Sequence, residues 1–194
     1  MPLNWRLAAV ELGRILSHAQ PTVVIHDAAF EPLLGGCDAP RVRRTGGPDD
    51  EYEALIASHE PRARMQDATW DTVNLLIYTS GTTGRPKGVI YTHRMTHNIV
   101  LHAALHARVR AHSRSLTYAP LFHSAGLCAT TLPQFHYGGV VVVMRTWDAG
   151  ACLAHLCDPE LAITHTVGVP TTFQQLAELP GFAAARFPAL EVCG

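Results

Sequence analysis

Apolar residues near the start of the chain recur at the spacing of an amphipathic helix. Within Leu7–Ala19 they follow the i, i+3, i+4, i+7 rule, which predicts a helix with one buried face. The members of this stripe are Leu12, Ile15, Leu16 and Ala19. Pro21 follows and cannot continue the helix, so the element is expected to end there.

Short apolar runs separated by turn residues and helical stretches fill the rest of the chain. Each run has the length of a buried strand. The predicted strands are Val23–Ile25, Asn74–Thr79, Val89–Thr92, Leu116–Ala119, Val140–Met144, Leu161–Val167 and Leu190–Cys193. Helices are predicted near Arg94–Val109, Gly126–Phe135 and Ala151–Cys157. Apolar strands that alternate with helices predict an α/β fold, a mostly parallel sheet covered by helices on both faces.

Polar and turn residues mark the boundaries of these elements. Gly35–Asp50 is rich in Gly, Pro, Arg and Asp and has no period, so a surface loop is expected there. Side chains that cap helix N-termini follow such stretches at three places. The predicted caps are Asp49 or Asp50 for a helix through Ser58, Asp148 for the helix over Ala151–Cys157, and Thr171 or Thr172 for a helix that stops at Pro180.

Composition narrows the class of protein. The 194 residues are 47% hydrophobic and 16% charged, with a formal net charge of −1. That balance is typical of a globular domain and offers no basic field for nucleic acid. No apolar run approaches the roughly 20 residues of a membrane span, and the N-terminus has no signal-peptide pattern. We therefore expect a cytoplasmic protein with no nucleic-acid partner and no membrane span. Its five cysteines, an odd number without CxxC, are expected to be reduced thiols.

The most informative segment is YTSGTTGRPKGV, residues 78–89, which follows a predicted strand. Its glycines let backbone N–H groups approach an anion, its hydroxyl side chains are donors, and Lys87 carries a positive charge. This mixture suits a polyphosphate. A Walker A loop is excluded, because Pro86 stands where that motif has glycine and the segment leads into a strand. A solvated turn is the alternative, but an ordinary turn does not need so many donors.

This segment resembles the signature loop of the adenylate-forming superfamily, which includes acyl-CoA synthetases, aryl-CoA ligases, luciferases and peptide-synthetase adenylation domains. In that family the loop wraps the pyrophosphate end of ATP. The resemblance implies that Lys87 helps to neutralise the departing pyrophosphate. The remaining phosphate contacts that it implies are Thr79, Ser80, Gly81, Thr82, Thr83 and Gly84.

Three further segments carry the same resemblance. Residues 120–127, PLFHSAGL, are similar to the PxFHxxG segment of the family, which implies that His123 lies by the acyl group and the α-phosphate and that Gly126 lines the substrate site. A structural histidine bonded to backbone is the alternative for His123. Residues 167–171, VGVPT, are similar to a segment beside the acyl pocket, so Val169 and Pro170 are implied substrate contacts. PLNWRL at residues 2–7 is similar to a PLNxRL segment of CoA ligases.

The resemblance implies a two-step reaction. A carboxylate attacks the α-phosphorus of ATP, and a thiol, usually that of CoA, then attacks the acyl-adenylate. ATP, Mg²⁺ and CoA are the implied cofactors and co-substrates, with a small-molecule carboxylic acid as the partner. Catalytic roles are implied for His123 and Lys87, and magnesium would share the charge neutralisation.

Several family segments are not found in these residues. YGxTE, which carries the magnesium-binding glutamate, and TGD, which holds the ribose, are both missing from the sequence. Residues 1–194 are therefore expected to form part of an AMP-binding N-terminal domain, without the small C-terminal domain and inactive alone. Two alternatives stay open: a non-catalytic nucleotide- or acyl-binding remnant, and a piece of an amino-acid adenylation domain.

Twelve histidines raise the question of a metal site. Two pairs have the i, i+4 spacing of metal ligands, but nine residues separate their first members, which puts the pairs on opposite sides of a helix. A four-histidine site is excluded on that ground, and surface positions are expected. The pairs are His93 with His97 and His102 with His106.

Overall fold

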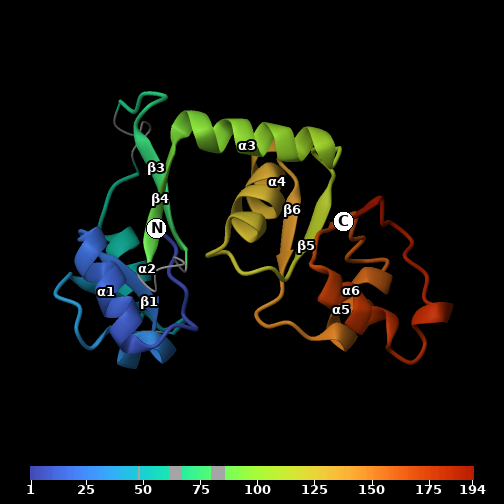
Figure 1. Ribbon diagram of the computed structural model, residues 1–194, viewed down its shortest axis with the longest axis horizontal. Coiled ribbons are helices and arrows are strands. Elements are labelled where there is room, and N and C mark those ends of the chain that lie inside the picture. Colours follow the sequence, from blue (N-terminus) through green and yellow to red (C-terminus); the bar gives the residue numbers. More distant parts are fainter. Residues whose placement is uncertain (48, 62–66, 80–85) are drawn as a thin grey trace. The chain divides into compact units, whose positions relative to one another are not determined.

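The structure is a computed structural model that describes residues 1–47, 49–61, 67–79 and 86–194 (Figure 1). The chain divides into two compact units, Met1–Ile90 and Tyr91–Gly194. Each unit has its own strands and its own hydrophobic cluster. Within the described residues, no helix is long and apolar enough to cross a membrane.

The first unit begins with the predicted helix and buries the predicted stripe. Leu16 on that helix packs with Val24 and Leu34 in a small hydrophobic cluster. The elements, in chain order, are α1 (Ala9–Ala19), β1 (Val24–Asp27), the 3₁₀ helix η1 (Ala28–Leu34), β2 (Arg41–Arg44), α2 (Glu51–Ala57), β3 (Val73–Thr79) and β4 (Lys87–Thr92), which runs on into the second unit. The helix and strand predictions for α1, β1, β3 and β4 are thus confirmed to within a few residues.

β2 corrects the sequence-based expectation of a loop over Gly35–Asp50. β1 and β2 form a parallel pair in which Val24 lies opposite Arg41. Arg-Val-Arg-Arg has a single apolar position and no pattern, so its strand character comes from the backbone pairing with β1. Arg43 also links the strand to α2, because its backbone N–H donates to Glu51 Oε2 at 2.8 Å.

Asp50 is the N-cap of α2, as predicted, and it also holds the preceding turn. Its Oδ1 accepts hydrogen bonds from the backbone N–H groups of Tyr52 and Glu53 at 3.0 and 3.2 Å. Its Oδ2 accepts from Thr45 and Gly46 at 3.1 and 2.7 Å. One carboxylate therefore satisfies donors on both sides of the helix start.

The second unit contains a four-stranded parallel sheet in the order β6-β5-β7-β8. Figure 1 shows α5 and α6 together on one side of these strands and α4 on the other. This arrangement confirms the predicted mostly parallel sheet with helices on both faces. The elements are α3 (His93–His106), β5 (Arg114–Thr117), the π-helix η2 (Ala125–Thr131), α4 (Leu132–Tyr137), β6 (Val140–Val143), α5 (Ala149–Cys157), β7 (His165–Thr166), α6 (Pro170–Ala177), the 3₁₀ helix η3 (Phe182–Ala184) and β8 (Val192–Cys193).

β5 is one of the two inner strands and contributes to the main core. Leu116, fully buried, and Tyr118, just beyond the strand, pack against Cys152 and Leu156 of α5 and Leu176 of α6. Successive side chains of a strand point to opposite faces. The other face of β5 therefore carries Ser115 and Thr117, whose hydroxyl side chains are buried. The strand also contacts η2.

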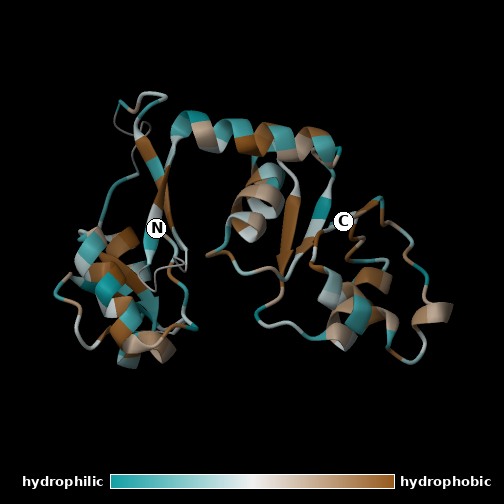
Figure 2. Cartoon of the chain, viewed as in Figure 1, coloured by the Kyte–Doolittle hydropathy of each residue, from teal (hydrophilic) through white to brown (hydrophobic). Residues whose placement is uncertain are grey.

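Two predicted strands behave differently from expectation. Val140–Met144 is hydrophobic along its length (Figure 2), yet β6 lies at the end of the sheet order, and Val140 and Val143 are 42% and 54% exposed. The run predicted over Leu161–Val167 is a strand only at its last residues, because Ala162 adopts φ 45°, which breaks the extended backbone.

Two helix starts also need correction. The helix predicted over Gly126–Phe135 is a π-helix followed by a short α-helix. For α6, neither Thr171 nor Thr172 is the N-cap. Val169 is the N-cap, and the Thr172 hydroxyl reaches back, accepting from Val169 N–H at 3.2 Å and donating to Val169 C=O at 2.7 Å. Pro170 occupies the first turn, where its missing N–H costs nothing. At α5, by contrast, Asp148 caps the helix as predicted.

Candidate functional site

The carboxyl ends of β5 and β7 form a topological switch point. From β5 the chain continues to β6 on one side, whereas from β7 it continues to β8 on the other. In open parallel sheets, ligands bind in the crevice outside the strand ends at such a point. The segments that leave these two ends are residues 118–126 and 167–170, which contain all four predicted acyl-side residues of this unit.

His123 lies in the turn after β5, with its side chain exposed. Its backbone N–H donates to the Pro120 carbonyl at 3.0 Å, and its carbonyl accepts from Leu127 N–H at 3.0 Å as η2 begins. The imidazole lies beside the ring of Phe122, with the ring centroids 4.7 Å apart and the planes tilted by 56°; Phe122 itself is 7% exposed. This placement disfavours the alternative of a buried histidine satisfied by backbone. The predicted substrate-facing role remains a prediction.

Gly126 is buried where the chain passes close to itself. A Cβ there would lie 2.7 Å from the Ala119 carbonyl oxygen and closer still to that of Pro120. The Gly126 carbonyl in turn accepts hydrogen bonds from the hydroxyls of Thr130 and Thr131 at 2.6 and 2.7 Å. Backbone packing at the start of the π-helix therefore accounts for glycine at this position, whatever it contacts in a ligand complex.

Residues 167–170 leave β7 beside the end of β8. Gly168 N–H donates to the Gly194 carbonyl at 2.7 Å. A Cβ at Gly168 would collide with the Tyr118 hydroxyl and lie 2.6 Å from Thr172 Oγ1. Val169, 57% exposed, and Pro170 present apolar surface at the same strand ends.

Tyr118 is a site-adjacent residue that the sequence did not single out. It directly follows β5, is 9% exposed, and packs its ring at 4.6 Å on Trp147. Burial raises the pKa of Tyr118, while the nearby hydroxyls of Thr166 and Thr172 act in the opposite direction. None of the described residues makes a hydrogen bond of normal geometry to its buried hydroxyl. No sequence signal marks this position, because Tyr118 meets Gly168 only through the pairing of β5 with β7.

The predicted phosphate contacts belong to the first unit. Thr79 is the last residue of β3 and Lys87 is the first residue of β4, and both are exposed. Ser80, Gly81, Thr82, Thr83 and Gly84 lie outside the described residues. The segment joins two neighbouring strands. This confirms that it leads into a strand rather than a helix, which rules out the P-loop interpretation.

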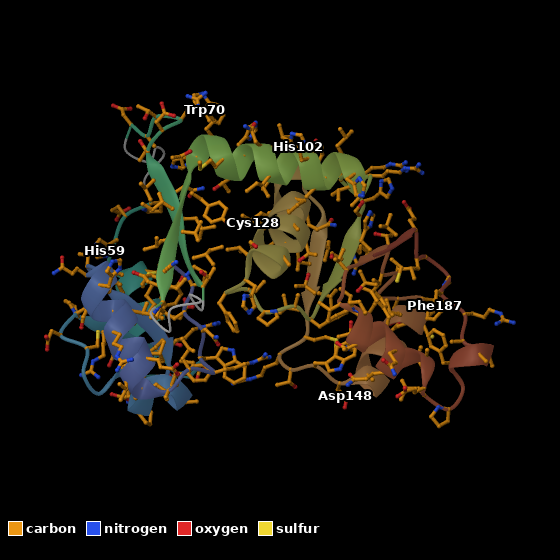
Figure 3. The ribbon with its side chains drawn as sticks, in the orientation of Figure 1. His59, Trp70, His102, Cys128, Asp148 and Phe187 are labelled. Carbon is orange, nitrogen blue, oxygen red and sulfur yellow. The ribbon has the colours of Figure 1, made fainter. Side chains whose placement is uncertain are left out.

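Histidines and cysteines form no metal site in the part of the chain that the structure describes. No cluster there holds three or more His, Cys, Asp or Glu side chains that could bind a metal ion. His102 stands on the outer side of α3 and Cys128 lies buried beneath it (Figure 3). His97 is half-buried, with its ring 5.5 Å from that of His136. All five cysteines are unpaired thiols.

Known proteins match this chain over its whole length. Residues 1–194 fit the family model described as AMP-binding enzyme. The chain is 35% identical to a feruloyl-CoA synthase of Amycolatopsis sp., over 100% of this chain and 38% of that protein. It is 32% identical to the long-chain-fatty-acid–CoA ligase FadD13 of Mycobacterium tuberculosis, over 97% of this chain and 38% of the relative. The chain thus spans less than half the length of these curated relatives.

Solved structures agree with these matches. The N-terminal domain of FACL13 from Mycobacterium tuberculosis superposes with a TM-score of 0.78 at 27% identity, over 97% of this chain and 48% of that one. ATP-bound MatB from Rhodopseudomonas palustris gives a TM-score of 0.81 at 22% identity, over 100% of this chain and 38% of that one, which shows a shared fold. By sequence and by fold, the chain belongs to the AMP-binding enzyme family, the adenylate-forming enzymes.

Proposed function

We propose that this chain contributes the phosphate-binding and acyl-facing parts of the active site of an acid–CoA ligase. The observation that carries the proposal is the switch point of the second unit, where exposed His123 and Val169 leave the carboxyl ends of neighbouring strands in a chain of the AMP-binding family. Curated relatives named as CoA ligases support the reaction class.

The proposed reaction activates a carboxylic acid in two displacements. A carboxylate oxygen attacks the α-phosphorus of ATP, and the bond to pyrophosphate breaks. The sulfur of CoA then attacks the acyl carbonyl, and AMP leaves as the thioester forms. Magnesium, when bound, supplies charge neutralisation on the phosphates.

The residues of this chain supply binding, orientation and charge. Lys87, exposed at the start of β4, offsets the negative charge that develops on the departing pyrophosphate. Thr79 and the glycine- and hydroxyl-rich residues after it donate hydrogen bonds to phosphate oxygens. His123 donates to a carboxylate or α-phosphate oxygen, which brings two anions together in line. Gly126, Val169 and Pro170 lie beside the acyl group.

The proposed substrate is a hydrophobic acid. The side chains that leave the two strand ends are small or apolar, and none carries a charge that could pair with a substrate amino group. The segments concerned are residues 125–127 and 167–169. Relatives that carry feruloyl, indoleacetate and long-chain-fatty-acid in their names agree with an apolar acid. An amino-acid adenylation domain is therefore the weaker alternative.

Binding of MgATP to the 194-residue chain, measured by calorimetry, is the direct test. We expect Lys87→Ala and Thr83→Ala each to weaken MgATP binding about tenfold, the lower end of the range for losing a hydrogen bond to a charged group. Arg110→Ala, an exposed cation elsewhere on the chain, is the matched control and should leave affinity unchanged. If both loop variants bind MgATP as tightly as the unmodified chain does, the loop is not the phosphate-binding segment.

Turnover needs a longer protein. We expect residues 1–194 alone to give no ATP–pyrophosphate exchange, because they cover 38% of the relatives that carry the activity. A chimera that adds the remaining segments of the feruloyl-CoA synthase should exchange pyrophosphate with hydrophobic acids. A clear preference of that chimera for amino acids would favour the adenylation-domain alternative, and binding without exchange in the chimera would favour a non-catalytic remnant.

A further inference from the structure

Tyr78 is the second-to-last residue of β3, and the predicted phosphate contacts begin directly after it at Thr79. The proposed loop leaves β3 at Thr79 and enters β4 at Lys87. The positions of those two strand ends therefore decide where the terminal members of the loop stand. A contact that fixes the ends of β3 and β4 against the rest of the first unit could therefore affect phosphate binding without contacting a phosphate.

Tyr78 makes such contacts on two sides. Its hydroxyl lies 2.5 Å from His18 Nδ1, and the two rings meet edge to face at 5.9 Å and 89°. Across the strand pair, a Cβ on Gly88 would lie 3.2 Å from Tyr78 Cζ. One side chain on β3 thus reaches both α1 and the second residue of β4, and Gly88 leaves the space that its ring occupies.

His18 is held on a rigid support. It lies in the last turn of α1, whose inner face is anchored by Leu12, Ile15 and Leu16, all less than 5% exposed. Burial raises the pKa of Tyr78, so its hydroxyl stays protonated and able to donate a hydrogen bond to His18 Nδ1. A group locked by packing and hydrogen bonding to a supported element holds its neighbours within the tolerance that a functional site needs.

We propose that Tyr78 and His18 are positioning residues for the phosphate site: they tie the β3 end to α1 and thereby fix Thr79 and Lys87 in their nucleotide-binding places. The proposal rests on the function proposed above for Lys87 and the loop. It adds a residue from a helix 60 positions earlier in the chain, outside the signature segment.

A double-mutant cycle on MgATP affinity tests this coupling. Tyr78→Phe and His18→Phe each remove one partner and should weaken binding about threefold to tenfold, the value of a typical hydrogen bond. The double variant should be no weaker than either single one, because both lose the same contact. His18→Asn, whose amide can replace Nδ1, should restore most of the affinity. Tyr52→Phe on α2 is the matched control. Additive losses, or single variants that bind as the unmodified chain does, would overturn the proposal.

Hydrogen exchange without nucleotide separates this inference from the proposed function. Tyr78→Phe and His18→Phe should both raise amide exchange in β3 and β4 by similar factors and leave α2 unchanged. If the unmodified chain does not bind MgATP, the proposed function fails, and this measurement still decides the inference. Unchanged exchange in β3 and β4 would then reject the role of the pair.

Discussion

Several glycines of the first unit have open surroundings, whereas three glycines of the second unit are tightly enclosed. In the first unit, a Cβ on Gly13 or Gly36 would meet nothing within 4 Å. In the second unit, a Cβ on Gly126, Gly139 or Gly168 would come within 2.7 Å of other atoms. At Gly126 these atoms belong to the backbone, which cannot move aside as a side chain can. The segment around Gly126 thus depends on close approach of the backbone to itself, and it should not tolerate a single added methyl group.

Gly88, in the first unit, differs from Gly126. It is crowded by the side chains of Leu76 and Tyr78, at 3.1 and 3.2 Å from a Cβ on it, and no backbone atom is among its nearest neighbours. Here the geometry beside the functional segment depends on side-chain contacts, with the His18 hydrogen bond at their end. The two segments should therefore be sensitive to different changes: added volume at Gly126, and lost side-chain contacts beside Gly88.

Core truncation should give the largest effect and should differ between the units. Leu116→Ala removes a fully buried side chain from the larger cluster and should cost about 3–4 kcal/mol in a urea titration. Leu34→Ala, in the small cluster of the first unit, should cost less. Leu105, 81% exposed, is the control and should change stability little on truncation. Equal losses at Leu34 and Leu116 would contradict a difference between the two cores.

Gly126→Ala tests the close approach itself. Its Cβ would overlap the Ala119 and Pro120 carbonyls, so we expect a loss of about 2 kcal/mol, in the range of overpacked sites. Gly150→Ala is the control, because its nearest neighbour is Asp148 Oδ1 at 3.4 Å. Thermal or urea unfolding measures both. If Gly126→Ala unfolds together with the unmodified chain, backbone packing is not what requires glycine there.

Gly13→Ala should have the opposite sign. Gly13 lies inside α1 with open space around its Cα. Alanine has a better helix propensity than glycine, because its unfolded backbone has fewer conformations to lose on folding. We therefore expect about 0.5–1 kcal/mol of stabilisation. The same titration shows it as a higher urea midpoint. A lower midpoint would contradict the open space beside Gly13.

Asp50 gives the smallest expected effect, visible only in acid. Burial raises the pKa of Asp50, but hydrogen bonds from Gly46, Glu53, Thr45 and Tyr52 outweigh it and hold the pKa below its ordinary value of 3.8. A depressed folded-state pKa stabilises the fold above the unfolded value, and this contribution is lost as pH falls through the folded pKa. Exchange of the α2 amides should rise below pH 4 in the unmodified chain. Asp50→Asn should lack this pH dependence; an identical acid profile would rule out the carboxylate as its source.

Local patterns predicted much of this fold. The apolar stripe of α1, the Asp50 and Asp148 caps and the buried run at Leu116 each depend on residues close in sequence, and all are present in the structure. β2 could not be predicted, because Arg-Val-Arg-Arg becomes a strand only through its pairing with β1.

The candidate site divides in the same way. Motifs singled out His123 and Val169, and the structure shows that they follow the ends of two neighbouring strands. They did not reveal Tyr118 beside Gly168, or His18 beside Tyr78. These contacts join residues 50 and 60 positions apart, and neither partner carries a local signal for the other.

The position of β5 in the middle of its sheet also sets an order of folding. Ser115 pairs with Val141 only 26 positions later, but with His165 after 50 positions, and β8 can join only once β7 is in place. Loop-closure entropy makes the longer closure costlier by about 0.6 kcal/mol. The β5–β6 pair is therefore expected to form early and the β7 side late. His123, which follows β5, would then be in place before Val169, which follows β7. The two positions would be brought together late in the folding of this unit.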